Sequence, residues 1–283
     1  YISEEYDEEN INSVRSKTLG LIREISKEIE DEALINFIRL LIDELMKGIN
    51  LDSYKEVIKL DDYNLVKPYL EKLNNDPLYI QMRQESNLLI LGNISDDLFR
   101  LKEGQLLTKK ETENLMNFLI NLIKNVEKEN SILIGRTIWC LSKLLCLVRN
   151  DIDYLTKIFE SVSQTLINPK SDLSIQLVSA QCISIICQRL ISQKKEIQSK
   201  YITKNYDALI LILNKVNEDT RFIPIENLLY LTKLSKENAL YIPLHHLTPV
   251  LKIYAENFND NYVGPKILEL IKIWCEDKRS AHC

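Results

Sequence analysis

The sequence predicts an all-α protein, an α-solenoid of HEAT-like helical hairpins that stack into a superhelix. Apolar residues recur at i, i+3, i+4 and i+7 in successive segments of helical length, and these segments pair roughly every 40 residues. No stretch between them reads as a strand. We therefore expect a single repeat array over residues 1–283, a fragment of a longer chain because its first residue is Tyr1 rather than Met.

The first predicted hairpin covers residues 8–48 and ends at Gly48, a residue that suits a helix C-terminus. The following segment, 49–76, is polar and loses the helical period. It contains Pro68 and ends in an Asn-Asn-Asp run before Pro77. This composition predicts an irregular insertion with room for one short helix.

The second predicted hairpin covers residues 77–127. Pro77 suits the first turn of a helix because its missing N–H would have no intrahelical partner there. Thr108 and Glu111 have the spacing of a capping box, which predicts that the second helix begins after Thr108.

The remaining hairpins are predicted over 131–168, 171–217 and 220–258, followed by a partial repeat at 261–277. Asn150 or Asp151 is expected to cap the helix that ends before Pro169. Pro249 is expected to kink its helix or to delay its start, because a proline inside a helix removes a backbone hydrogen bond.

The charge balance excludes sequence-independent binding to nucleic acid. The chain has 41 acidic and 36 basic side chains, a net charge of −5, whereas phosphate contacts need clustered Lys and Arg. The most acidic stretch lies near the N-terminus and can attract a basic partner. Its alternative interpretation is a solvated acidic segment that favours the start of the next helix. The five carboxylates are Glu4, Glu5, Asp7, Glu8 and Glu9.

No catalytic residue, metal site or cofactor is predicted. The chain has no P-loop, GxGxxG, GxSxG or HExxH pattern, so it is not expected to be an enzyme. The cysteine pairs are spaced five and six residues apart, wider than the usual zinc spacing, and are expected to be reduced. His245 and His246 have no ligand partner at a useful spacing, which favours a capping or surface role. No apolar run approaches the roughly 20 residues of a membrane span.

Two segments resemble β-karyopherin repeats of the importin-β superfamily. The segment ILIGRTIWCLSKLLCLV (132–148) is similar to the repeat signature in which a Gly-Arg start and a Trp lead into a Leu-rich helix. The segment LSIQLVSAQCISIICQRL (173–190) resembles the next repeat. ISEEYDEENINSVRSKTLGLI (2–22) and YIQMRQESNLLILGNISDDL (79–98) resemble parts of the importin-nine family and its fungal counterparts. The resemblance covers nearly the whole chain and is strongest at 131–192.

This resemblance implies a HEAT-repeat nuclear import receptor that shuttles between cytoplasm and nucleus through the nuclear envelope pore. Such receptors bind basic protein cargo, including histones and ribosomal proteins, contact Phe-Gly nucleoporins and release cargo to the Ran GTPase. The main Ran contacts would lie in repeats outside this chain. No direct nucleic-acid binding and no membrane insertion are expected. Because this family lines its concave side with second helices, the resemblance adds three residues to the predicted cargo-binding set, Asp207, Glu218 and Asp219.

A different class of protein fits the same repeats. A static HEAT-repeat scaffold, such as a phosphatase regulatory subunit or the helical arm of a large kinase, would use the same helices without a transport role. The insertion at 49–76 also departs from the animal members of the resembled family, because its few carboxylates are mixed with lysines rather than forming a strongly acidic stretch.

Overall fold

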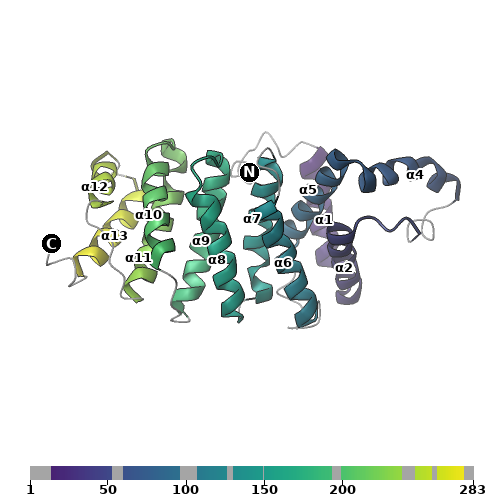
Figure 1. The fold of residues 1–283 in the computed structure, drawn as a ribbon, viewed down its shortest axis with the longest axis horizontal. Helices are drawn as coiled ribbons and strands as arrows, with labels where there is room; N and C mark the ends of the chain where they lie inside the picture. The colour runs from purple at the N-terminus through teal and green to yellow at the C-terminus, as the bar shows by residue number, and fades with distance from the viewer. Residues whose placement is uncertain are drawn as a thin grey trace. The chain divides into compact units, whose positions relative to one another are not determined.

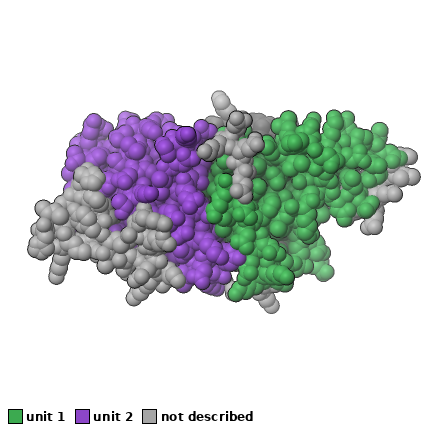
Figure 2. Space-filling model, viewed as in Figure 1, with its two compact units in different colours: residues 1–147 green, residues 148–283 purple. Residues whose placement is uncertain are grey.

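The computed structural model describes residues 14–52, 60–95, 107–125, 130–148, 150–192, 199–237, 246–256 and 260–276. These residues are 88% helical and include no strand, so the all-α prediction is confirmed for them. They form twelve α-helices. The chain divides into two compact units, Tyr1–Leu147 and Val148–Cys283, coloured separately in Figure 2. The prediction of one array over 1–283 stays a prediction.

The helices of unit 1 gather around α5. This helix packs against α1, α2 and α4, which precede it in the sequence, and against α7, which follows it (Figure 1). Helix α7 also packs against α6. Leu34, Leu88 and Leu119 are fully buried at these contacts. The helices are α1 (Val14–Glu28), α2 (Asp31–Lys47), α4 (Leu60–Asn75), α5 (Pro77–Asn93), α6 (Lys109–Asn125) and α7 (Ser131–Leu144).

The insertion is more regular than the sequence suggested. Helix α4 runs for 16 residues with Pro68 inside it, so the expectation of an irregular segment is wrong for this part. Tyr63 is buried and Val66 and Leu70 are half-buried, at a spacing that places them on one face of the helix. This apolar face offsets the hydrogen bond that Pro68 cannot donate.

One side chain joins the two ends of the insertion. Asn74 Nδ2 donates to the carbonyl oxygen of Ile49 at 2.8 Å, and Asn74 Oδ1 accepts from the Ile49 N–H at 2.8 Å. The same oxygen accepts a 2.6 Å hydrogen bond from Arg83 Nη1 on α5. The end of α4 is therefore fastened both to the segment after α2 and to the central helix of the unit.

Helices α5 and α7 approach each other closely at Gly92. A Cβ atom added there would lie 2.6 Å from Cη2 and 2.9 Å from Cε3 of Trp139, distances at which real Cβ atoms are essentially never found. Gly92 is buried and Trp139 is half-buried. The contact therefore depends on the absence of a side chain at position 92.

The helices of unit 2 pack against helices one or two places away in the sequence. Helix α9 contacts α8 and α11, α11 also contacts α10 and α13, and α12 contacts α13. This pattern is consistent with stacked helical hairpins (Figure 1). The helices are α8 (Ile152–Ile167), α9 (Leu173–Ser192), α10 (Ser199–Leu213), α11 (Phe222–Glu237), α12 (Leu247–Glu256) and α13 (Val263–Glu276), with the 3-10 turns η4 (Leu145–Val148) and η5 (Glu218–Thr220).

Buried asparagines connect successive hairpins of unit 2. Asn205 on α10 donates through Nδ2 to Ser163 Oγ on α8 at 2.8 Å, and Asn227 on α11 donates to the carbonyl oxygen of Ala180 on α9. Both asparagines are fully buried. Because a buried amide without a partner costs free energy, sliding one helix along the next would lose these bonds and is disfavoured.

The predicted helix starts are confirmed where polar caps define them. Thr108 donates through its backbone N–H and its hydroxyl to Glu111 Oε2 at 2.7 and 2.8 Å, and Glu111 N–H donates back to Thr108 Oγ1 at 3.3 Å. The backbone N–H of Thr108, followed by its hydroxyl, lowers the pKa of Glu111. Pro249 lies in the first turn of α12, which begins at Leu247, so the expectation that this proline delays the start of its helix is confirmed.

Removing the cap of α8 should destabilise unit 2. Asp151 accepts a 3.2 Å hydrogen bond from the Tyr154 N–H. Replacing Asp151 by Ala is expected to lower the free energy of unfolding by about 1 kcal/mol, measured from urea unfolding followed by circular dichroism. Asp153→Ala is the matched control, because this exposed carboxylate lies in the same turn but does not cap it. Equal losses in the two variants would contradict the capping role.

The expectation that no segment is long and apolar enough to cross a membrane is wrong. Ser131–Val148 has 18 residues with mean hydropathy 1.6, and Leu173–Ser192 has 20 residues with mean hydropathy 1.3. Isolated polar side chains such as Arg136 interrupt the apolar runs, but the mean hydropathy of each whole segment stays high. In the structure 61% and 67% of these segments are buried, as in core helices covered on several sides. The absence of membrane insertion therefore stays a prediction.

The cysteines differ sharply in expected reactivity. Cys140, Cys182 and Cys187 are buried and Cys275 is exposed. Burial raises the pKa of Cys140 and of Cys182 to about 12, and that of Cys187 still further. Since the thiolate is the reactive form, we expect an aromatic disulfide reagent at pH 8 to label Cys275 quickly in the native protein. The three buried thiols should react only after unfolding. Peptide mass spectrometry checks this, and equally fast labelling of Cys182 would contradict it.

Candidate functional site

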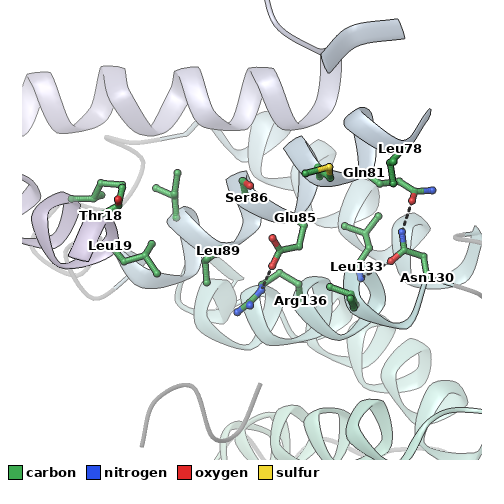
Figure 3. A pocket seen from close by; sticks show the side chains of 14 residues that line it. Thr18, Leu19, Leu78, Gln81, Glu85, Ser86, Leu89, Asn130, Leu133 and Arg136 are labelled. Carbon is green, nitrogen blue, oxygen red and sulfur yellow. Dashed lines mark hydrogen bonds and ion pairs between the residues drawn. The ribbon is translucent and has the colours of Figure 1, made fainter. Parts of the chain in front are cut away.

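An open groove lies along one face of α5 in unit 1. Its volume is about 810 Å³. Helix α5 forms its floor, and α1 and α7 form its walls (Figure 3). The lining consists of seven residues of α5, three of α1 and three of α7, together with Asn130, which precedes α7. The floor residues lie on one helix face: Leu78, Gln81, Met82, Glu85, Ser86, Leu89 and Ile90.

The groove exposes several large apolar side chains. Leu78 is 62% exposed, Met82 is 55% exposed and Ile132, on the α7 wall, is 57% exposed. Exposed apolar residues are ordinary when they are scattered singly, but those that line one depression form a contiguous patch. This patch is the strongest candidate binding surface that the described residues provide.

An ion pair lies between the floor and the α7 wall. Arg136 Nε donates to Glu85 Oε1 at 2.8 Å, and the two side chains point toward one another in Figure 3. The side chain of Arg136 is 3% exposed and that of Glu85 is 16% exposed. The guanidinium also lies 5.1 Å from the ring centroid of Trp139. These are the two charged side chains of the lining, so their charges cancel.

Two more polar contacts fasten the walls to the floor. Asn130 Nδ2 donates to Gln81 Oε1 at 2.6 Å, while its Oδ1 caps α7 by accepting from the Leu133 N–H at 3.0 Å (Figure 3). On the other side, Arg23 Nη2 on α1 donates to Asn93 Oδ1 at the end of α5, at 2.5 Å. Both walls are therefore held to α5 by side-chain hydrogen bonds, and the groove is preformed.

The three predicted cargo-binding residues that the structure describes, Asp207, Glu218 and Asp219, are not in the lining of the groove. Glu4, Glu5, Asp7, Glu8 and Glu9 are outside the described residues. Asp207 is exposed on α10, as expected for a residue of a second helix. Glu218 and Asp219 are exposed in the turn η5, between α10 and α11, rather than on a second helix. Their assignment to cargo binding stays a prediction.

Asp207 also has a local partner. Its Oδ1 lies 3.2 Å from Nε2 of His246, a residue that is only 4% exposed, so the expected surface role is wrong for this histidine. The ring centroid of His246 is 5.5 Å from that of Tyr206, which is in turn 6.2 Å from Trp274. These rings bury the imidazole between α10, α13 and the start of α12. Part of the role of Asp207 is therefore structural.

The described residues include no group of three or more His, Cys, Asp or Glu side chains that could hold a metal ion. The groove was not predicted from the sequence, in which the acidic residues were the more prominent feature. The sequence did contain a signal for the groove. Leu78, Met82 and Ser86 are spaced four residues apart and so share one face of a helix whose apolar residues also occupy another face. Such a helix either is covered on all sides or offers one face to a partner.

No family model, no curated protein and no solved structure matches this chain. The structure supports an all-helical protein whose neighbouring helices pack together.

Proposed function

We propose that this chain is a helical-repeat scaffold that binds other proteins through the outer faces of its helices. The observation that carries the proposal is the packing of each described helix in unit 2 against helices one or two places away in the sequence. In such an array each helix buries one stripe and keeps another for solvent or a partner. The preformed apolar groove of unit 1 supports the same conclusion.

We further propose that the scaffold is part of a nuclear import receptor for basic protein cargo. This proposal rests on the resemblance of residues 131–192 to β-karyopherin repeats. The residues of the resembled signature have contacts that suit a repeat protein. Arg136 pairs with Glu85 of the neighbouring α5, and Trp139 packs against Gly92 of the same helix. The signature thereby links successive hairpins.

The import proposal is tested by pull-down. The chain, and the full-length protein that carries it, are immobilised and offered core histones and Phe-Gly repeat peptides. We expect both to be retained, and we expect Ran-GTP to release the histones from the full-length protein. Histones that are held irrespective of Ran-GTP, without retention of Phe-Gly repeats, would favour a static scaffold. Failure to retain any protein partner would contradict the scaffold itself.

Charge reversal at the N-terminus should slow the capture of basic cargo. We expect replacement of Glu4, Glu5, Asp7, Glu8 and Glu9 by Lys to lower the association rate for core histones and to flatten its salt dependence, because electrostatic steering acts mainly on association. Stopped-flow fluorescence measures the rate. A control with the same change in net charge replaces five exposed carboxylates elsewhere: Asp31, Glu32, Asp43, Asp62 and Glu71. An equal loss of rate in the control would contradict a specific role for the N-terminal segment.

A further inference from the structure

We propose that the groove between α1, α5 and α7 is a docking site for an amphipathic helix of a partner protein. The proposal rests on the proposed scaffold function and assigns one of its binding surfaces. The groove has a helical floor, two helical walls and exposed apolar side chains. Its length and its lining together define the kind of segment that fits.

The floor has the length of a short helix. From Leu78 to Ile90 it spans twelve residue steps, or about 18 Å at 1.5 Å per residue. A partner helix of about three turns lying along α5 covers this length and places side chains at i, i+3 or i+4, and i+7 over the floor. The volume of about 810 Å³ accommodates several side chains.

The lining argues against three other common modes of peptide recognition. Addition of a strand requires the edge of a sheet, and the described residues include no strand. Recognition of a polyproline helix requires an aromatic groove, whereas none of the lining residues is aromatic. Recognition of phosphorylated or acidic peptides requires clustered arginines, and the groove has one, Arg136, already paired with Glu85. Compared with these three modes, a helix laid in an apolar groove is the one that the lining fits.

Charge complementarity fixes the chemistry of the occupant. Because Glu85 and Arg136 neutralise each other, a charged side chain placed on the floor would lose hydration without gaining an opposite charge. The buried face of the partner helix is therefore uncharged and carries Leu, Ile, Met or Phe. Basic cargo, which the proposed function assigns to acidic residues elsewhere, does not fit this groove.

Side-chain hydrogen bonds also join the walls of the groove to its floor. The bonds of Asn130 to Gln81, Arg136 to Glu85 and Arg23 to Asn93 hold both walls in place before a partner arrives. A preformed groove avoids part of the entropy that ordering a flexible site would cost. Met82 at its centre can adapt to side chains of different shape.

The test uses a synthetic helical peptide of about 15 residues with Leu at i, i+3, i+4 and i+7 and Lys and Glu elsewhere. A scrambled peptide of the same composition is the control. The three methionines of the chain are labelled with ¹³C in their methyl groups and observed by NMR. Met82 lies in the groove, Met116 is fully buried and Met46 is outside the lining. The striped peptide should shift the Met82 signal alone, and the scrambled peptide should shift none.

A matched pair of variants locates the site. Met82→Lys should weaken binding of the striped peptide at least tenfold, whereas Leu211→Lys, at an equally exposed position on α10, should leave it unchanged. Circular dichroism checks that both variants keep their helices. Equal binding of the two peptides, a shift of Met46 without Met82, or undiminished binding to Met82→Lys would each overturn the proposal.

Two further titrations address other occupants. A Met82 signal that changes with protein concentration alone would assign the groove to a second copy of the chain and overturn the proposal. Preference for an extended Phe-Gly peptide over the striped helix would do the same. If pull-down retains histones or Phe-Gly repeats while the striped peptide fails to bind, the scaffold function stands and the groove assignment falls. If the striped peptide binds but neither histones nor Phe-Gly repeats are retained, the groove assignment stands and the import proposal falls.

Discussion

Replacing Gly92 by Ala is expected to lower the free energy of unfolding of unit 1 by about 3 kcal/mol, the upper part of the range for overpacked cores. The added methyl group would overlap the ring of Trp139, with 2.6 Å between Cβ and Cη2. To relieve the overlap, α5 and α7 must separate or the indole must leave its position against α5. Urea unfolding followed by circular dichroism measures the loss.

Gly20→Ala provides the control for this substitution. A Cβ at Gly20 meets nothing within 4 Å, and the residue lies inside helix α1. Alanine is favoured over glycine in helices by roughly 1 kcal/mol, so this variant should be slightly more stable than the parent. Combining Gly92→Ala with Trp139→Leu should recover part of the loss. If Gly92→Ala behaved like Gly20→Ala, the close packing of α5 on α7 would be wrong.

The second large effect is expected from breaking the ion pair in the groove. Replacing Glu85 by Leu leaves the guanidinium of Arg136, which is only 3% exposed, without its 2.8 Å carboxylate partner. Removal of one partner of a buried pair destabilises a protein by about 3 to 5 kcal/mol. Because the side chain of Glu85 is 16% exposed, we expect a loss near the lower value. Thermal unfolding and urea unfolding both report it.

The double variant Glu85→Leu with Arg136→Met separates charge from packing. Because it removes both charges and keeps apolar volume, we expect it to recover most of the stability lost by Glu85→Leu alone. The exposed pair of Asp43 and Lys47, at 2.7 Å and with both side chains more than half exposed, gives the comparison. Asp43→Ala should change stability by less than about 0.5 kcal/mol. Equal effects of Glu85→Leu and Asp43→Ala would contradict the role assigned to burial.

Several helix starts could be predicted because local chemistry determines them. Pro77 occupies the first turn of α5, Thr108 and Glu111 form the predicted capping box, and Asp151 caps α8. Helix α4 was not expected at this length because Pro68 indicated an interruption, whereas Pro68 is exposed and leaves the apolar face of Tyr63, Val66 and Leu70 intact. The helix forms because the apolar side chains of that face are at least partly buried, and a reading by local propensity underrates this effect.

The candidate site could not be predicted in the same way. Its lining comes from residues between Thr18 and Arg136, on three helices separated by most of unit 1. Periodicity identifies which face of α5 is apolar, but not which parts of that face remain uncovered after packing. His246 shows the same limit, since its burial depends on Tyr206 and Trp274 rather than on adjacent residues.

The amide of Asn74 makes the insertion a side branch of the unit. Its paired hydrogen bonds with Ile49 join positions 25 residues apart, so the chain re-enters the helical stack beside the point where it left. Between two ends that are already held together, each doubling of the intervening length adds only about 0.6 kcal/mol of closure entropy. A change of length between Ile49 and Asn74 should therefore have a small entropic cost, as long as the hydrogen bonds of Asn74 to Ile49 and Arg83 are kept.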